Sequence, residues 1–183
     1  MLTTDQKGVI AESAIVLAAV TKGFGVLKPL SDGERYDLIF DLRPGLVRVQ
    51  CKWASLHDDV VVVRCYSCRR TRNGMRKRAY GPDEVDAVAA YCLELSRCFY
   101  FPMSWMSGRT FVQLRLGPSR NNQRKGINWA DDFDFERLQS VSLGAIAQLG
   151  ERLRGTQEVG GSSPPGSIDS DVGTLVVSQV CLP

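Results

Sequence analysis

Tyr36-Asp37-Leu38-Ile39-Phe40-Asp41 and Val47-Arg48-Val49-Gln50-Cys51-Lys52-Trp53 are two short apolar runs that decide the fold. The turn signal Arg43-Pro44-Gly45 separates them, so the segment predicts a β-hairpin. Because alternate residues of a strand point to the same face, Gln50 and Lys52 are expected to share a face. The partner strand can present Asp37 beside them.

These three side chains suggest a chemistry for one end of the hairpin. A carboxylate and a second oxygen donor are the ligands that Mg²⁺ prefers. A lysine beside them can stabilise the negative charge that develops when water attacks a phosphodiester. The hairpin therefore predicts a site for metal-dependent phosphodiester hydrolysis.

A helix is expected ahead of the hairpin, beginning at the N-cap candidates Thr3 and Thr4 and ending at Gly23. Its expected apolar face consists of Val9, Ala11, Ile15, Val16, Ala19 and Val20. Glu12 lies within this segment. Taken alone, Glu12 fits the solvent side of an amphipathic helix, and only the three residues that follow it in order favour a place in the site.

The ordered set Glu12, Asp37, Gln50 and Lys52 resembles the PD-(D/E)xK nuclease superfamily. Within it, the set is similar to the bacterial group I intron-associated homing endonucleases, which use Q-x-K where most relatives use D-x-K or E-x-K. The resemblance covers residues 3–135, and Tyr36 stands where the superfamily pattern has proline. The superfamily places its acid before the apolar core of the strand, which favours Asp37 over its rival Asp41.

This resemblance implies an α/β fold in which a central mixed β-sheet is flanked by helices, as in restriction endonucleases. It also implies a Mg²⁺-dependent endodeoxyribonuclease, with Mn²⁺ as a possible substitute, that cuts double-stranded DNA at a specific site as a homo-oligomer, a dimer or a tetramer. Asp37 would be the principal metal ligand, Gln50 would bind through its side-chain oxygen, and Glu12 would complete the shell. Lys52 would position water and stabilise the developing charge.

Two basic segments are candidates for DNA contacts. The chain carries seven Lys and Arg and no acid from Arg64 to Arg78, and a second segment rich in basic and amide side chains follows residue 117. Arginine, lysine and amide groups bind phosphates and read base edges. The candidate residues are Arg69, Arg70, Arg72, Arg76, Lys77 and Arg78 in the first segment, and Arg120, Asn121, Asn122, Gln123, Arg124 and Lys125 in the second.

The remaining pattern predicts further sheet and helix elements. Residues 59–64 read as a strand buried on both faces in the middle of the sheet, joined to the Gln-x-Lys strand by a connection over residues 53–57. Residues 81–93 predict a second helix, and strands are expected over residues 98–101 and, at the sheet edge, 111–116. Trp129 and Phe133 are expected to anchor the last packed segment. Cys65 and Cys68 lack a second such pair, so a zinc site is not expected.

Length and composition set the outer limits. The 183 residues allow one nuclease-sized domain, residues 1–138, and a flexible tail, residues 139–183. No apolar run approaches the roughly 20 residues needed to cross a bilayer, and no signal pattern opens the chain. We therefore expect a cytoplasmic protein whose six cysteines are thiols, with no membrane association.

The tail has a second interpretation. Codons for residues 147–152 can match the D-arm of a transfer RNA, and codons for residues 161–164 can match its T-loop and stem. We therefore predict that the reading frame runs through a tRNA gene and that this segment is not selected as protein.

Three alternatives stay open on sequence alone. A junction resolvase or repair nuclease of the same superfamily would use the same residues. A decayed nuclease would bind DNA without cutting it. A structural α/β protein with a basic surface would do neither, and would show no salt-sensitive DNA binding.

Overall fold

The computed structural model describes residues 1–138 except 32, 44, 73, 107 and 119–124, so the predicted tail, its tRNA hypothesis and the predicted contacts of residues 120–124 lie outside the described residues. The secondary structure consists of α1 (Thr4–Thr21), β1 (Gly25–Leu27), β2 (Leu38–Asp41), β3 (Leu46–His57), β4 (Val60–Arg64), β5 (Tyr66–Thr71), β6 (Gly74–Ala79), β7 (Ala87–Cys92), β8 (Arg97–Pro102), α2 (Met103–Met106), β9 (Phe111–Arg115) and the 3₁₀ turns η1 (Ala130–Phe133) and η2 (Phe135–Arg137).

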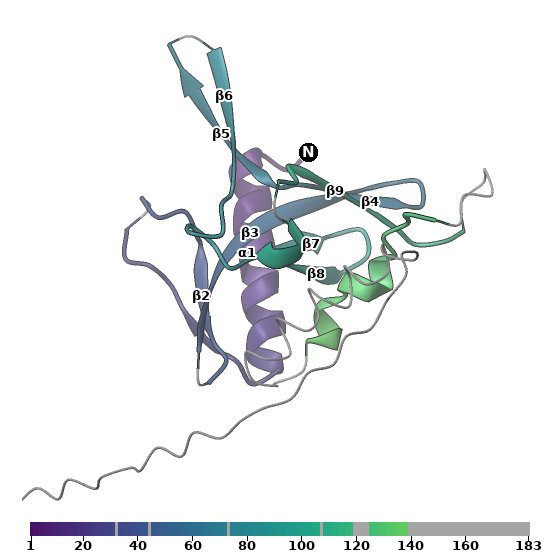
Figure 1. Ribbon diagram of the computed structural model, residues 1–183, viewed down its shortest axis with the longest axis horizontal. Coiled ribbons are helices and arrows are strands. Elements are labelled where there is room, and N and C mark those ends of the chain that lie inside the picture. The colour runs from purple at the N-terminus through teal and green to yellow at the C-terminus, as the bar shows by residue number, and fades with distance from the viewer. Residues whose placement is uncertain (32, 44, 73, 107, 119–124, 139–183) are drawn as a thin grey trace, which may run out of the picture.

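A seven-stranded mixed sheet is organised around the long strand β3 (Figure 1). On one edge, β3 pairs antiparallel with β2 through residues 46–49 and with β4 through residues 54–57. On the other edge, residues 49–54 pair with β7, which runs parallel to β3. β1 extends the sheet beyond β2, β9 beyond β4 and β8 beyond β7. The prediction of a mixed central sheet is confirmed.

The first helix begins and packs largely as the sequence predicts. Thr3 accepts a hydrogen bond from the Gln6 backbone N–H, and the Gln6 side chain accepts one from the Thr3 N–H, so the helix starts with a capping box. Its buried residues, Ala11, Ile15 and Ala19, recur every fourth position and face the sheet. The predicted stripe was too wide, because Val9 and Val20 are 66% and 54% exposed.

The sheet separates two apolar clusters. On one face, α1 packs against alternate residues of the sheet that include Val49, Ala87 and Ala89. On the other face, Val88 and Ala90 pack with residues of α2, β9 and η1. Because β3 and β7 contribute to both clusters, they form the interior of the fold.

The predicted helix over residues 81–93 is wrong. Gly81 to Val85 form a turn, and β7 begins at Ala87, a strand whose members are all buried except the half-buried Tyr91. A short apolar run carries no period that separates a buried strand from a buried helix, and parallel pairing with β3 decides for the strand. The predicted strand at 98–101 is confirmed as β8, but it follows β7 as an antiparallel neighbour without a helix between them.

Other sequence predictions are refined. Residues 53–57 are the second half of β3, not a connection, because they pair with β4. β4 does lie between two strands, yet Val60 and Val62 are only half-buried, so one of its faces is partly open. β9 is an edge strand with alternating burial, as predicted. Of the two expected anchors, Phe133 is buried, whereas Trp129 is 37% exposed.

The first basic segment forms a separate two-stranded hairpin, β5–β6, that projects beyond the main sheet (Figure 1). All of β6 is exposed. The pairing register puts Ser67, Thr71, Arg76 and Arg78 on one face, and Tyr66, Met75 and Lys77 on the other. The first of the two predicted DNA-contacting segments therefore forms a projecting basic hairpin.

The cysteine and membrane expectations can be compared with the described residues. The five described cysteines are free thiols: Cys51, Cys65, Cys68, Cys92 and Cys98. Cys181 lies outside the described residues. None of the described helices has the length and hydropathy of a membrane span.

Candidate active site

Asp37 lies at a gap in the sheet. Its backbone N–H donates to the Val49 carbonyl over 2.9 Å, immediately before β2 begins. β2 leaves this edge of β3 at Val49, and β4 joins it only at Ala54. In the interval, the Cys51 N–H donates to Asp37 Oδ2 over 2.8 Å. The Asp37 carboxylate thus takes the place of a missing strand partner and is fixed against β3.

Gln50 contacts the same carboxylate oxygen. Its side-chain Nε2 donates to Asp37 Oδ2 and lies 3.3 Å from the Cys51 carbonyl oxygen. Gln50 is 8% exposed, and among the described residues it is the polar side chain that is buried in the core. A role as a metal ligand through Oε1 requires the opposite orientation of this amide, with the oxygen turned toward Asp37.

Burial raises the pKa of Asp37 above its usual value. The Cys51 N–H and the charge of Lys52 oppose this increase, as does Lys28, whereas Glu12 adds to it. Among the described residues, no cationic side chain forms an ion pair with Asp37. A fixed, largely buried carboxylate without a cationic partner favours binding of a cation that could compensate its charge.

Glu12 and Lys52 lie within electrostatic range of Asp37 but make their direct contacts elsewhere. A Glu12 oxygen lies 2.5 Å from Lys28 Nζ, an ion pair that joins α1 to the end of β1. Lys52 Nζ lies 5.0 Å from the centre of the Tyr80 ring. The structure therefore brings Asp37 and Gln50 into contact and places the other two predicted residues around them.

The donor set fits a hard divalent cation. Asp37 and Glu12 supply carboxylates and Gln50 an amide oxygen, the groups that Mg²⁺ takes in proteins. In the described chain no cluster of three or more His, Cys, Asp or Glu side chains is placed to hold a metal. Two carboxylates and one amide carry less negative charge than three carboxylates. The affinity for the metal would therefore depend on Asp37 and Glu12.

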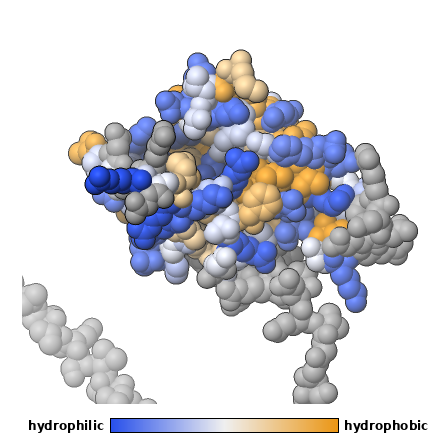
Figure 2. All heavy atoms as spheres, turned by 90° about the horizontal axis from the view of Figure 1, so that it is seen from above, coloured by the Kyte–Doolittle hydropathy of each residue, from blue (hydrophilic) through white to orange (hydrophobic). Residues whose placement is uncertain are grey.

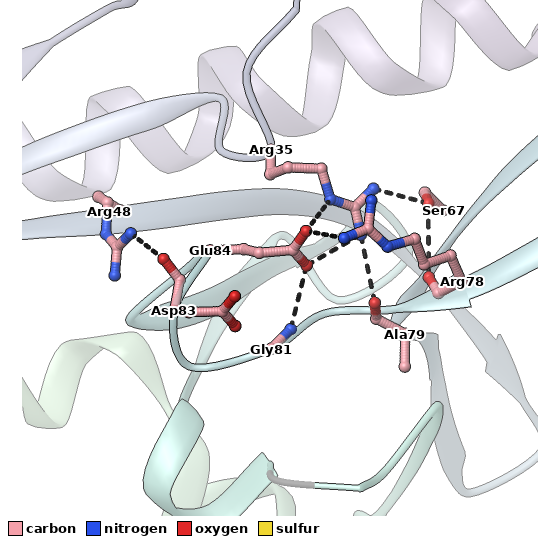
Figure 3. A network of polar contacts seen from close by, with 8 residues as sticks. All are labelled: Arg35, Arg48, Ser67, Arg78, Ala79, Gly81, Asp83 and Glu84. Atoms are coloured by element: carbon pink, nitrogen blue, oxygen red, sulfur yellow. Dashed lines mark hydrogen bonds and ion pairs between the residues drawn. The ribbon is translucent and has the colours of Figure 1, made fainter.

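A polar network fixes the base of the β5–β6 hairpin beside this site (Figure 3). Arg35, two residues before Asp37, donates to both oxygens of Glu84 over 3.2 and 3.3 Å and to Ser67 Oγ over 2.8 Å. It also donates to the Ala79 carbonyl. Arg78 approaches the same carboxylate. Burial acts to raise the pKa of Glu84. Hydrogen bonds from Gly81 and Arg35, together with the charges of Arg35 and Arg78, outweigh burial and lower this pKa.

A groove of about 620 Å³ lies between this hairpin and the segment before Asp37. Its lining consists of Gly33, Arg35, Ser67, Thr71, Arg76 and Arg78. Three guanidinium groups line the groove, and Glu84 pairs with two of them. The lining thus keeps an excess of positive charge, which suits a polyanion.

The predicted DNA-contacting residues divide into three groups. Arg72, Arg76 and Lys77 are exposed on the hairpin, whereas Arg78 is held by Glu84. Arg69 and Arg70 belong to β5, and their side chains are outside the description, as are residues 120–124. Lys125 is exposed. Figure 2 views the end of the molecule from which the hairpin projects, and hydrophilic side chains predominate there.

Sequence reasoning missed Lys28, Arg35, Tyr80 and Glu84. Each acts on the site through a partner distant in the chain, such as Arg35 on Glu84 and Lys28 on Glu12. No local spacing signals such pairs. Only the position of Arg35, directly before the Tyr36-Asp37 run, could have drawn attention to it.

Comparisons with known proteins agree with this geometry. A family model described as PD-(D/E)XK endonuclease matches residues 2–136. The solved structure of a bacterial homing endonuclease, I-Ssp6803I, is similar with a TM-score of 0.61 and 26% sequence identity, covering 86% of this chain and 100% of that chain. The comparison with curated proteins gave no match.

Proposed function

The chain belongs to the PD-(D/E)XK endonuclease family, and from that membership we propose that it is a metal-dependent endodeoxyribonuclease of the site-specific, intron-associated homing type. The carrying observation is the Asp37–Gln50 pair, fixed at the gap in the sheet beside β3, with Lys52 on the same strand as Gln50. The similarity to a bacterial homing endonuclease supports the homing type over a junction resolvase or a repair nuclease.

The residues have distinct roles in this proposal. Asp37, Gln50 and Glu12 would hold Mg²⁺, or Mn²⁺ in its place, and the metal would supply a Lewis acid for the phosphodiester oxygen. Asp37 keeps its position through the Cys51 N–H, so its carboxylate needs little reorganisation. Lys52 orients the attacking water and stabilises the charge on the pentavalent phosphorus. Glu12, which pairs with Lys28 in the structure, would complete the metal shell.

DNA would lie along the basic hairpin. Arg76 and Arg35 line the groove beside the hairpin, and phosphate contacts there would position the duplex. Lys77 is exposed on the opposite hairpin face and could meet a second strand or groove of the duplex. The segment of residues 120–125 remains a proposed second contact.

A double-strand break requires two active sites, so we propose that the enzyme acts as a homo-oligomer. The outer face of α1 exposes the apolar side chains of Val9, Leu17 and Val20, which a second copy could bury. We also propose that it acts in the cytoplasm, where cysteines such as its five described free thiols stay reduced.

We further propose that residues 1–138 form the nuclease domain and that residues 139–183 are encoded by read-through of a tRNA gene. The coding DNA of the tail decides this point. A segment that cannot fold as a cloverleaf contradicts it.

Nicking of supercoiled plasmid DNA that carries the gene's own insertion region tests the proposed activity. The wild-type protein should cut with Mg²⁺ and be inactive with a chelator. Asp37→Ala and Lys52→Ala should abolish cutting and keep salt-sensitive DNA binding, measured by fluorescence anisotropy. Full cleavage by either variant would refute the assignment, and binding without metal-dependent cleavage by the wild type would identify a decayed nuclease.

A further inference from the structure

The catalytic lysine proposed above has an aromatic partner that the mechanism does not use. Lys52 Nζ lies 5.0 Å from the centre of the Tyr80 ring, within the range of a cation–π interaction. With the described residues, the Lys52 ammonium forms neither a hydrogen bond nor an ion pair. The ring of Tyr80 is therefore the contact that restrains this ammonium group in the described structure.

Tyr80 is itself held firmly. It is 8% exposed and packs in the apolar cluster that contains Val85 and Val88. The Arg35 guanidinium lies 4.6 Å from its ring centre. Arg35 is in turn fixed by both oxygens of Glu84 and by Ser67. The ring thus has a defined place between the active site and the hairpin base.

We infer that Tyr80 is a positioning residue that holds the Lys52 ammonium in its reactive place, and that Arg35 fixes Tyr80 against the base of the β5–β6 hairpin. This inference rests on the proposed nuclease function and adds a residue to it. Tyr80 directly follows β6, so the DNA-contacting hairpin and the catalytic lysine share one aromatic anchor.

An aromatic ring suits this task better than an acid. A lysine side chain has a flexible stem, and ordering it costs rotamer entropy. A carboxylate partner would order it but would neutralise its charge and use its N–H donors. The π face attracts the cation without taking a proton donor, so the N–H groups of Lys52 remain available for water and phosphate.

Two substitutions at Tyr80 separate the ring from the hydroxyl group. Tyr80→Phe keeps the π face and should retain the wild-type single-turnover rate of plasmid nicking with Mg²⁺ at saturating enzyme. Tyr80→Leu keeps apolar volume without a π face and should lower that rate about 5- to 30-fold. Anisotropy measures any change in DNA affinity, and saturating enzyme keeps such a change out of the rate comparison.

Tyr66→Leu is the matched control. It removes a second lysine–tyrosine pair, in which Lys77 Nζ lies 5.1 Å from the Tyr66 ring centre on the hairpin. Its single-turnover rate at saturation should equal that of the wild type, whatever happens to affinity. Thermal unfolding of each variant shows whether a rate change reflects loss of fold.

A spectroscopic measurement keeps the inference testable if Tyr80→Leu does not fold. The ring current of Tyr80 should shift the NMR signals of the Lys52 methylene protons next to Nζ, which Lys52→Ala identifies by their loss. Wild-type protein and Tyr80→Phe should show this shift. Its absence from the wild type overturns the inference.

The outcomes distinguish the two proposals. If the wild type cleaves, Lys52→Ala is inactive and folded Tyr80→Leu cleaves at the wild-type rate, the positioning role is wrong and the nuclease assignment stands. If Lys52→Ala cleaves normally, the catalytic assignment itself has failed, and the positioning role falls with it.

Discussion

Two aspartates flank β3 in nearly the same backbone arrangement, and they differ in the side chain that contacts each carboxylate. Asp37 precedes β2 on one edge, and Asp86 precedes β7 on the other. Each donates its N–H to a β3 carbonyl over 2.9 Å, Val49 for Asp37 and Arg48 for Asp86. Each accepts a β3 backbone N–H over 2.8 Å. The backbone alone does not distinguish a structural acid from a catalytic one.

The side chains opposite the two acids do distinguish them. Asp86 receives a two-pronged contact from the Arg48 guanidinium, at 2.9 and 3.0 Å. Burial acts to raise its pKa, but the hydrogen bonds and charge of Arg48 lower it overall. Asp37 meets the neutral amide of Gln50 instead, and burial raises its pKa. This difference supports the proposal that Asp37, and not Asp86, is the metal ligand.

The largest expected difference is catalytic. Asp37→Asn should lower Mg²⁺-dependent nicking at least about a hundredfold, because it removes the main anionic ligand. Asp86→Asn should leave the rate of the folded protein near the wild-type value. Single-turnover nicking of the two variants measures the contrast, and equal losses in both would show that the two edges of β3 are not functionally distinct.

The free energy of unfolding should fall when Asp86, rather than Asp37, is replaced. Asp86→Asn should lower the free energy of unfolding at pH 7 by about 1–2 kcal/mol, a discounted value because the Asp86 side chain is more than a third exposed. The folded-state pKa of Asp86 is lowered, so its contribution is present above the unfolded pKa and is lost as the pH falls through the folded value. Urea unfolding from pH 7 to pH 3 should therefore show the two proteins converging. A constant difference contradicts this account.

Making position 50 acidic should sharpen the contrast. Gln50→Glu places a second carboxylate beside Asp37, which should reduce the Mg²⁺ concentration for half-maximal nicking several-fold. The same repulsion should lower the thermal stability of the metal-free variant, with recovery on addition of Mg²⁺. Titration of activity and of melting temperature with Mg²⁺ measures both effects. An unchanged metal requirement indicates that residue 50 lies outside the metal shell.

The smallest effect concerns Asp37 itself. The pKa of Asp37 is higher in the folded protein than in the unfolded chain. Burial of its ionised carboxylate therefore lowers stability when the pH is above the folded-state pKa, and has no effect when the pH is below the unfolded-state pKa. Asp37→Asn should therefore be more stable than the wild type at pH 7 and equal to it in acid, the opposite sign to Asp86→Asn. Paired urea titrations at pH 7 and pH 3 test this. A destabilised Asp37→Asn would show that the Cys51 and Gln50 hydrogen bonds outweigh the burial of charge.

The sequence was sufficient wherever a feature is local. The helix start at Thr3 and the hairpin that carries Asp37 and Gln50 follow from caps, turn chemistry and alternation within a few residues. The ordered residues of the site were also enough to indicate the family.

Features that join distant segments required the tertiary structure. The run from Ala87 to Cys92 becomes a strand because β3 offers it a parallel partner, and its apolar pattern alone fits a helix equally well. The sequence identifies Asp37 and Asp86 only as acids before apolar runs. Strand pairing places the Arg48 guanidinium beside Asp86. It places the Gln50 amide and the Cys51 N–H beside Asp37. That pairing decides which carboxylate is neutralised and which stays available for a metal, because a charge's energy depends on the neighbours that the fold supplies.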